Sequence, residues 1–297
     1  MSRSTPHRYR VVDVFTQEPL AGNALAVFPD ASTLDGATMQ RIAKELNLSE
    51  TSFILPPTRA ECAARVRIFT PARELSFAGH PTIGTGFVLL DEGLQPSPNG
   101  GFVLEENIGP VAVRVEPGPR PMLWLTTPPI ATGRTYDAQL CASVLGLPSN
   151  DLLDIAPQLL SAGNPTVFVA LRDKAAVDRA RLDLTGMLRV RGSDPERICV
   201  FVFAPTPEGA YSRMFAPEYG IVEDPGTGSV TGPLAAFMMR HGLISSASGT
   251  RFVSEQGTLM GRRCLLHVHI RGAGGSEGID VGGHVTPLAT ASMQLAT

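Results

Sequence analysis

Two short segments combine a polar side chain, a proline and small residues where a helix is expected to begin. The first is Gly79-His80-Pro81-Thr82, and the second is Asp224-Pro225-Gly226-Thr227 followed by Gly228-Ser229. Backbone N–H groups at a helix N-terminus bind anions, and glycine lets a ligand approach the backbone. The pattern predicts two helix ends that hold a small carboxylate substrate, with His80 and Asp224 beside it.

Glu50 is the third candidate for chemistry. It lies between an amphipathic helical segment and an apolar strand segment. A carboxyl group in partly apolar surroundings has a raised pKa and can act as a general acid and base. Each candidate also has a structural alternative. Glu50 could be a surface residue in a turn, Asp224 only a helix cap, and His80 only a buried, hydrogen-bonded histidine.

Other kinds of site find little support in the sequence. His267 and His269 alternate along one expected strand, but no third ligand type lies nearby, so we expect no metal site. Gly84-Thr85-Gly86 is too short for a dinucleotide fingerprint, and the chain has no Gly-Lys-Ser/Thr of a phosphate-binding loop. We therefore expect neither a metal nor a nucleotide cofactor.

Alternating strands and helices are predicted to position these candidates. Apolar residues at helical spacing, Met39, Ile42, Ala43 and Leu46, predict a helix that Asp35 caps. Two further helices are expected, from Pro81 to about Asp91 and from Ser229 to about Arg240. Among the expected strands are Val11–Phe15, Ala24–Phe28, Thr51–Leu55, Val66–Phe69 and Ile198–Phe203.

The two halves of the chain share short matches in the same order, which we interpret as a duplicated domain rather than chance recurrence. The matches are Gly22-Asn23 with Gly163-Asn164, Phe69-Thr70-Pro71 with Phe215-Ala216-Pro217, His80-Pro81-Thr82 with Asp224-Pro225-Gly226-Thr227, and Phe102–Glu105 with Phe252–Glu255. We predict an N-terminal lobe over 1–125, joined by a strand near 280–297, and a C-terminal lobe over 126–280. In this interpretation His80 and Asp224 occupy equivalent positions facing one cleft.

Composition excludes several classes of partner. The net charge of −3 gives no electrostatic footprint for nucleic acid or an anionic membrane. The longest apolar run, Ile198–Pro205, is far shorter than the roughly 20 residues of a membrane span. Four scattered cysteines and a basic start without an apolar stretch after it favour a cytoplasmic protein.

Taken together, these motifs resemble those of the phenazine-biosynthesis isomerase (PhzF-like) family, within the diaminopimelate epimerase fold. The resembling segments include Val12–Thr16 with Gly22-Asn23, Asn47–Phe53, Phe69-Thr70-Pro71, Phe77–Thr85, Met214–Pro217, Asp224–Ser229, Glu255-Gln256-Gly257 and Val281-Gly282-Gly283. The resemblance implies an α/β (α+β) fold of two pseudo-symmetric lobes, each a curved mixed sheet around a central helix. It also implies a homodimer without metal or cofactor.

Carried over by motif, Glu50 is the proton-shuttling acid and base. His80, Asp224 and Gly79 position the substrate, and Gly228 with Ser229 form the second anion-binding helix end. The second motif has Gly226 where many relatives have alanine, which is a small departure. Epimerases of this fold use one thiol per lobe, but no cysteine lies in either loop here.

The resemblance implies an isomerase that moves a proton between carbons of a small, cyclic amino or hydroxy acid, such as trans-2,3-dihydro-3-hydroxyanthranilate. Two alternatives stay open at this point. One is a lyase, tautomerase or epimerase that acts on another small acid. The other is a non-catalytic binding protein that keeps the fold, although Glu50, His80 and Asp224 together argue against it.

Overall fold

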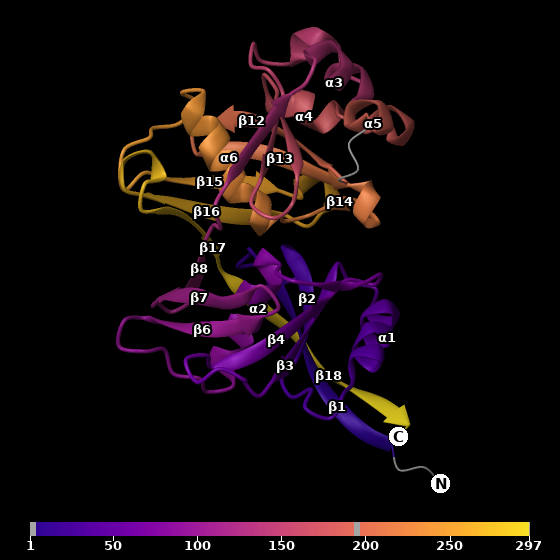
Figure 1. Cartoon of the computed structure of the whole chain (residues 1–297), viewed down its shortest axis with the longest axis vertical. Helices are drawn as coiled ribbons and strands as arrows, with labels where there is room; N and C mark the ends of the chain where they lie inside the picture. Colours follow the sequence, from indigo (N-terminus) through magenta and orange to yellow (C-terminus); the bar gives the residue numbers. More distant parts are fainter. Residues whose placement is uncertain (1–3, 193–196, 297) are drawn as a thin grey trace. The chain divides into compact units, whose positions relative to one another are not determined.

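The computed structural model describes residues 4–192 and 197–296, and its contacts divide the chain into two compact units. The first unit comprises the residues up to Leu125 and those from Gly282 onward, and the second is Thr126–Val281. The strands β8 (Met122–Thr126) and β17 (Gly278–Gly283) carry the chain between them (Figure 1). Both units mix strands and helices, which confirms the expected α/β class. No helix within the described residues is long and apolar enough to span a membrane.

The first unit is a mixed sheet with two helices. Its elements are β1 (Ser4–Val14), β2 (Asn23–Phe28), α1 (Gly36–Leu46), β3 (Glu50–Leu55), β4 (Ala64–Phe69), β5 (Glu74–Leu75), α2 (Gly79–Asp91), β6 (Gly101–Glu106), β7 (Gly109–Glu116) and β18 (Val285–Ala296). The late strand β18 runs antiparallel to β1, from Val14 opposite Val285 onward (Figure 1). The end of the described chain therefore completes the sheet with which the chain begins.

Helix α1 begins where its sequence predicts. The Asp35 side chain accepts a hydrogen bond from the backbone N–H of Thr38, which satisfies one of the free donors at a helix start. The helix buries Met39, Ile42 and Ala43 in a cluster with aromatic side chains of the sheet, among them Phe28. This cluster fixes α1 on one face of the first sheet.

Helix α2 packs against the opposite face. Successive side chains of a strand point to opposite faces, so Leu25 lies on the other side of β2 from Phe28. A Cβ atom at Gly84 of α2 would lie 2.6 Å from Leu25 Cδ2 and 2.9 Å from Val14 Cγ2. Glycine at this position therefore lets the helix lie directly on the sheet, and this glycine serves packing rather than ligand binding.

The second unit contains more helix than the first. Its elements are β9 (Ala131–Thr135), α3 (Ala138–Val144), β10 (Gln158–Ser161), β11 (Thr166–Ala170), α4 (Lys174–Arg179), α5 (Leu184–Arg191), β12 (Cys199–Thr206), β13 (Gly209–Ala216), β14 (Ile221–Asp224), α6 (Gly228–Arg240), β15 (Arg251–Gln256) and β16 (Cys264–Arg271). Short 3-10 turns occur at Ser149–Asp151, Pro217–Tyr219, Thr258–Met260 and Ala273–Gly275.

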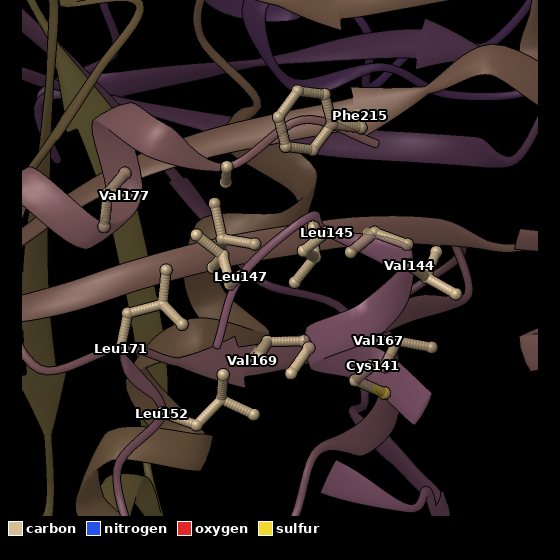
Figure 2. Packing of buried hydrophobic residues seen from close by; sticks show 14 of the residues in the cluster. Cys141, Val144, Leu145, Leu147, Leu152, Val167, Val169, Leu171, Val177 and Phe215 are labelled. Atoms are coloured by element: carbon tan, nitrogen blue, oxygen red, sulfur yellow. The ribbon is translucent and has the colours of Figure 1, made fainter. Parts of the chain in front are cut away.

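Alternating residues of β11 supply both cores of the second unit. Val167 and Val169 face the cluster that includes Cys141 and Leu145 around α3 (Figure 2). Phe168 lies in the other cluster, which includes the buried residues of α6. The strand is therefore apolar throughout, because helices cover both faces of its sheet.

The two units share one strand-pairing scheme. In the first unit β2 and β3 are parallel, β3 and β4 antiparallel, and β4 and β6 parallel. In the second unit β11 and β12, β12 and β13, and β13 and β15 repeat these directions in the same order. Helices α2 and α6 follow the corresponding strands, and each has 13 residues. This scheme allows residues of one unit to be matched with residues of the other.

Candidate active site

Glu50 and His80 meet in the first unit. Glu50 is the first residue of β3 and pairs in register with Leu25, whose side chain lies under α2. His80 is the second residue of α2, directly after Gly79. The His80 Nε2 atom lies 3.4 Å from Glu50 Oε2, and both side chains are buried. The structure thus brings three of the expected site residues together.

Asn23 sets the orientation of the His80 ring. The Asn23 Nδ2 atom lies 3.3 Å from His80 Nδ1. Because an amide N–H₂ group only donates, Nδ1 accepts and the ring proton lies on Nε2, toward Glu50. Asn23 is placed by the preceding residue Gly22, which has a φ of +70° and whose Cβ would lie 2.5 Å from the Val14 carbonyl oxygen. Only glycine fits this turn without strain.

Burial keeps the His80 imidazole neutral. It lowers the pKa of His80 to about 3, because a charged ring loses its hydration in the protein interior. The contact with Glu50 is therefore a contact between a neutral N–H group and a carboxyl group, and not an ion pair. Such an N–H group can support a carboxylate that gives up and takes back a proton.

Asp224 lies in a network of polar groups in the second unit. The Thr227 hydroxyl group donates a hydrogen bond to Asp224 Oδ2. Gln256 Nε2 in turn donates to Thr227 Oγ1 at 3.0 Å and to the Asp224 backbone oxygen at 2.7 Å. Thr227 is the N-cap of α6, so the structure excludes the interpretation of Asp224 as the cap of this helix.

The start of α6 presents Gly228 and Ser229. Both residues are partly exposed, and the Ser229 hydroxyl accepts a hydrogen bond of 2.9 Å from Asn164 Nδ2. Asp224, Gly228 and Ser229 therefore lie in one segment of the second unit. This segment has the free backbone N–H groups of a helix start, which suit an anion.

The expected equivalence of His80 and Asp224 is wrong. In the strand register Met214 pairs with Asp224, and its counterpart Ile68 pairs with Leu75, so Asp224 matches Leu75. His80 instead matches Ser229, since each is the second residue of its helix and each contacts an asparagine. The sequence match followed the prolines, whereas hydrogen bonds between distant segments fix the true alignment.

The strand register also identifies the counterpart of Glu50. Glu50 and Cys199 are the first residues of corresponding strands, β3 and β12. Cys199 is buried, and its burial raises the pKa of the thiol to about 12. The second unit therefore carries an inert thiol at the position of the carboxyl group, so the pairing of a carboxyl group with an imidazole occurs in the first unit and is not repeated in the second.

The structure also bears on the other two structural alternatives, those for Glu50 and His80. Glu50 is 9% exposed, which excludes a surface glutamate in a turn. His80 is indeed buried and hydrogen-bonded, and it also contacts the expected acid. No group of three or more His, Cys, Asp or Glu residues among the described residues is arranged to hold a metal ion.

Sequence reasoning assigned no role to three residues that organise these sites. In the sequence Asn23 and Gln256 are only parts of motifs, and Thr227 is only a small residue of a loop. The signal was present for Asn23, because Gly-Asn recurs before corresponding strands of both halves. Nothing local distinguishes Gln256, which reaches Thr227 from a distant strand.

Comparison with solved structures identifies the class of fold. The chain resembles a protein from Pseudomonas aeruginosa described as a predicted epimerase, with a TM-score of 0.79 and 34% identity, over 98% of this chain and 99% of that one. It also resembles a PhzF-family phenazine biosynthesis protein from Bacillus anthracis, with a TM-score of 0.86 and 22% identity, over 98% and 100%. The fold is thus an epimerase-like α/β fold.

Sequence comparison identifies the family within that class. Residues 12–291 match the family model described as phenazine biosynthesis-like protein. The chain is 38% identical over 272 residues to the trans-2,3-dihydro-3-hydroxyanthranilate isomerase of Pseudomonas aeruginosa, across 90% of this chain and 92% of that protein. The chain therefore belongs to the phenazine biosynthesis-like (PhzC-PhzF) family. This confirms the family expected from the sequence and supports the expected isomerase class.

Proposed function

We propose that this protein is an isomerase that moves a proton between carbons of a small, cyclic amino or hydroxy acid, such as trans-2,3-dihydro-3-hydroxyanthranilate. The observation that carries the proposal is the contact of Glu50 with the neutral imidazole of His80. The 38% identity to a relative named for this isomerisation supports the choice of substrate class.

In the proposed mechanism Glu50 first acts as a base. It removes a proton from a carbon that is acidic through conjugation to a carboxylate-bearing π-system, and the electron pair of the C–H bond enters that system. The protonated Glu50, whose acidic proton can exchange with solvent, then delivers a proton to another carbon on the same face, where the electron pair forms the new C–H bond. No atom is gained or lost, so the reaction needs neither an oxidant nor a second substrate.

His80 supports Glu50 in both halves of this cycle. While Glu50 is ionised, the Nε2–H group of His80 faces its carboxylate and stabilises the charge. The Asn23 amide holds the ring in the tautomer that this role requires. Asp224 and the N–H groups at Gly228 and Ser229 are proposed to bind polar and anionic groups of the substrate as charge develops during the transfer.

We also propose that the reaction needs no metal or nucleotide cofactor and that the protein is a homodimer, as the family resemblance implies, and that it is cytoplasmic, as its scattered cysteines favour. Exhaustive chelation should leave turnover unchanged. Loss of turnover that added zinc or manganese restores would contradict the first point. Light scattering of the purified protein in solution tests the dimer, and a monomer at micromolar concentration would contradict it.

The test of the isomerase itself is isotope exchange. The protein is incubated with trans-2,3-dihydro-3-hydroxyanthranilate in heavy water, and the product is analysed for deuterium bound to carbon. A carboxyl group that takes up the proton and exchanges it with solvent introduces deuterium at the new C–H position. Deuterated product from the parent, formed about 10²–10⁴-fold more slowly by Glu50→Gln, supports the proposal, whereas equal rates with both would overturn it.

A further inference from the structure

Glu106 is a buried carboxyl group that the proposed reaction does not use. It is the last residue of β6, and its side chain points to the start of α2. Its Oε1 atom lies 2.5 Å from Thr82 Oγ1, and that hydroxyl oxygen also lies 2.7 Å from the backbone oxygen of Ala78. Ala78 is the N-cap of α2, two residues before His80.

Counting protons assigns the donor in this chain of oxygens. A threonine hydroxyl has one hydrogen and can donate to one acceptor. The Ala78 carbonyl oxygen can only accept, so the hydrogen of Thr82 points to it. The short contact between Thr82 and Glu106 then needs a hydrogen that comes from Glu106. With an ionised Glu106, one of these two contacts would place oxygen lone pairs against each other.

We propose that Glu106 is a positioning residue that keeps its proton in the folded protein at neutral pH and, as a hydrogen-bond donor, ties the first turn of α2, and with it His80, to the end of β6.

The second unit has a permanently neutral side chain at the position that matches Glu106. In the strand register Arg65 pairs with Glu105, and its counterpart Tyr211 pairs with Glu255. Glu106 therefore matches Gln256. Gln256 donates through Nε2 to the hydroxyl of Thr227, the N-cap of α6. A carboxylic acid and an amide have nearly the same shape, so both units place a donor at the matching strand position and direct it to a threonine hydroxyl in the first turn of the helix, at Thr82 in α2 and at the N-cap Thr227 in α6.

Burial agrees with the neutral form. Glu106 is 4% exposed, and its Oε2 atom is buried without a hydrogen-bond partner among the described residues. A neutral carbonyl oxygen tolerates this far better than a carboxylate does. Burial, the largest cause, raises the pKa of Glu106 to about 8.

The charged groups of the neighbouring elements have partners of their own. Glu105 on β6 accepts hydrogen bonds from Thr58, and Glu74 on β5 pairs with Arg67 on β4. On β7, Arg114 lies near Glu116. His80 on α2 is neutral at this pH. None of these groups is a cause of the raised pKa of Glu106, which comes from its burial.

Stability as a function of pH tests the protonation state. A raised pKa in the folded state makes folding take up a proton, so the contribution of Glu106 to the folding equilibrium constant falls about tenfold for each unit rise in pH between about 4.5 and 8. Glu106→Gln should lose this dependence and keep a donor to Thr82. The exposed Glu61→Gln is the matched control and should follow the parent. Parallel pH profiles of the parent and Glu106→Gln would overturn the proposal.

Infrared spectroscopy of the parent gives a second measurement that does not need the Glu106 variant to fold. A protonated carboxylic acid has a carbonyl band distinct from that of a carboxylate. We expect such a band at pH 7, its loss above about pH 8, and a shifted frequency in Thr82→Val. Absence of a protonated-acid band at pH 7 would also overturn the proposal.

Amide exchange tests the positioning role, with the second unit as an internal control. The Thr82 amide donates to the Ala78 oxygen, and the Val230 amide donates to the Thr227 oxygen at the start of α6. Above pH 8 the protection factor should fall about tenfold or more at Thr82 and stay constant at Val230, since Gln256 has no proton to lose. In Glu106→Gln neither should fall. Equal changes at both amides in the parent would show that Glu106 has no positioning role.

Any effect of Glu106 on turnover would act through the position of His80 beside Glu50. This part of the inference rests on the proposed function. The three measurements above need no substrate. If the isotope-exchange test fails while these succeed, Glu106 still positions the start of α2. If these three measurements fail while isotope exchange succeeds, the proposed isomerase function holds and the role of Glu106 is excluded.

Discussion

His80 and Glu50 face each other with Nε2 3.4 Å from Oε2, one at the start of a helix and the other at the start of a strand. The imidazole is neutral and its proton lies on the atom that faces the carboxyl group. The acid can therefore change its protonation state beside a fixed hydrogen-bond donor, as proton transfer to and from carbon requires.

Glu50→Gln should keep the fold and substrate binding while turnover falls by about 10²–10⁴-fold, the usual contribution of a general acid and base. The amide retains the shape of the side chain but cannot take up the proton. The exposed Glu45→Gln on α1 is the control for removing one carboxyl group. Turnover and affinity are measured for both variants, and a loss within about threefold, well below that range, would exclude Glu50 as the acid and base.

Asn23→Ala should impair the site without removing any group that exchanges a proton. It leaves Nδ1 of the buried His80 without its donor, which costs about 1–3 kcal/mol of stability. It also frees the ring to place its proton on Nδ1. Urea unfolding gives the first effect, and nitrogen NMR of the imidazole gives the tautomer. Asn164→Ala, at the matching position, should leave the His80 tautomer as it is in the parent.

Acidification should destabilise the protein through His80. Its pKa is 6.5 when exposed and about 3 in the folded protein, so the unfolded chain binds more protons between these values. Stability from this group is complete above pH 6.5 and falls by about 1.4 kcal/mol per pH unit on acidification toward 3. Glu106 has the opposite slope above about pH 4.5, so the two effects offset each other up to 6.5.

The pH dependence of stability should therefore be measured in the Glu106→Gln variant, where the contribution of Glu106 no longer masks that of His80. Adding His80→Gln should flatten the profile between pH 4.5 and 6.5, whereas adding the control His267→Gln on β16 should not. A slope that persists without His80 would assign the acid sensitivity to another group.

Gly84→Ala should destabilise the first unit by about 1–3 kcal/mol, the usual cost of overpacking a core. The added Cβ would lie within 2.9 Å of side-chain atoms of both Leu25 and Val14. Gly118→Ala is the matched control, because its nearest contact would be an ordinary 3.6 Å to the Arg120 oxygen. Its unfolding free energy should stay within about 0.5 kcal/mol of that of the parent.

Local signals predicted the elements well. Asp35 and the apolar spacing after it placed α1 correctly, and the apolar run at Ile198–Phe203 forms most of β12. Helix α2 begins at Gly79, two residues before Pro81, so the proline is inside the first turn rather than at its first position. Local sequence therefore predicts that this helix exists, whereas its first residue differs from the expected one by two positions.

Features that depend on contacts between distant segments were not predictable from local sequence. The match of His80 with Ser229 depends on two asparagines at the starts of other segments. Glu106, beside Glu105 and a turn, has the sequence of a solvated strand end, yet α2 covers it. Its burial arises from α2, which precedes β6 in the sequence.

The pairing of β1 with β18 also has a consequence for synthesis of the chain on the ribosome. The second unit is one continuous segment and can fold as soon as it emerges. The first unit lacks the strand opposite β1 until the whole second unit and then β18 have been translated. At typical elongation rates the edge of β1 that pairs with β18 stays unpaired for roughly 10–30 s. During translation, the half that begins first is thus completed last.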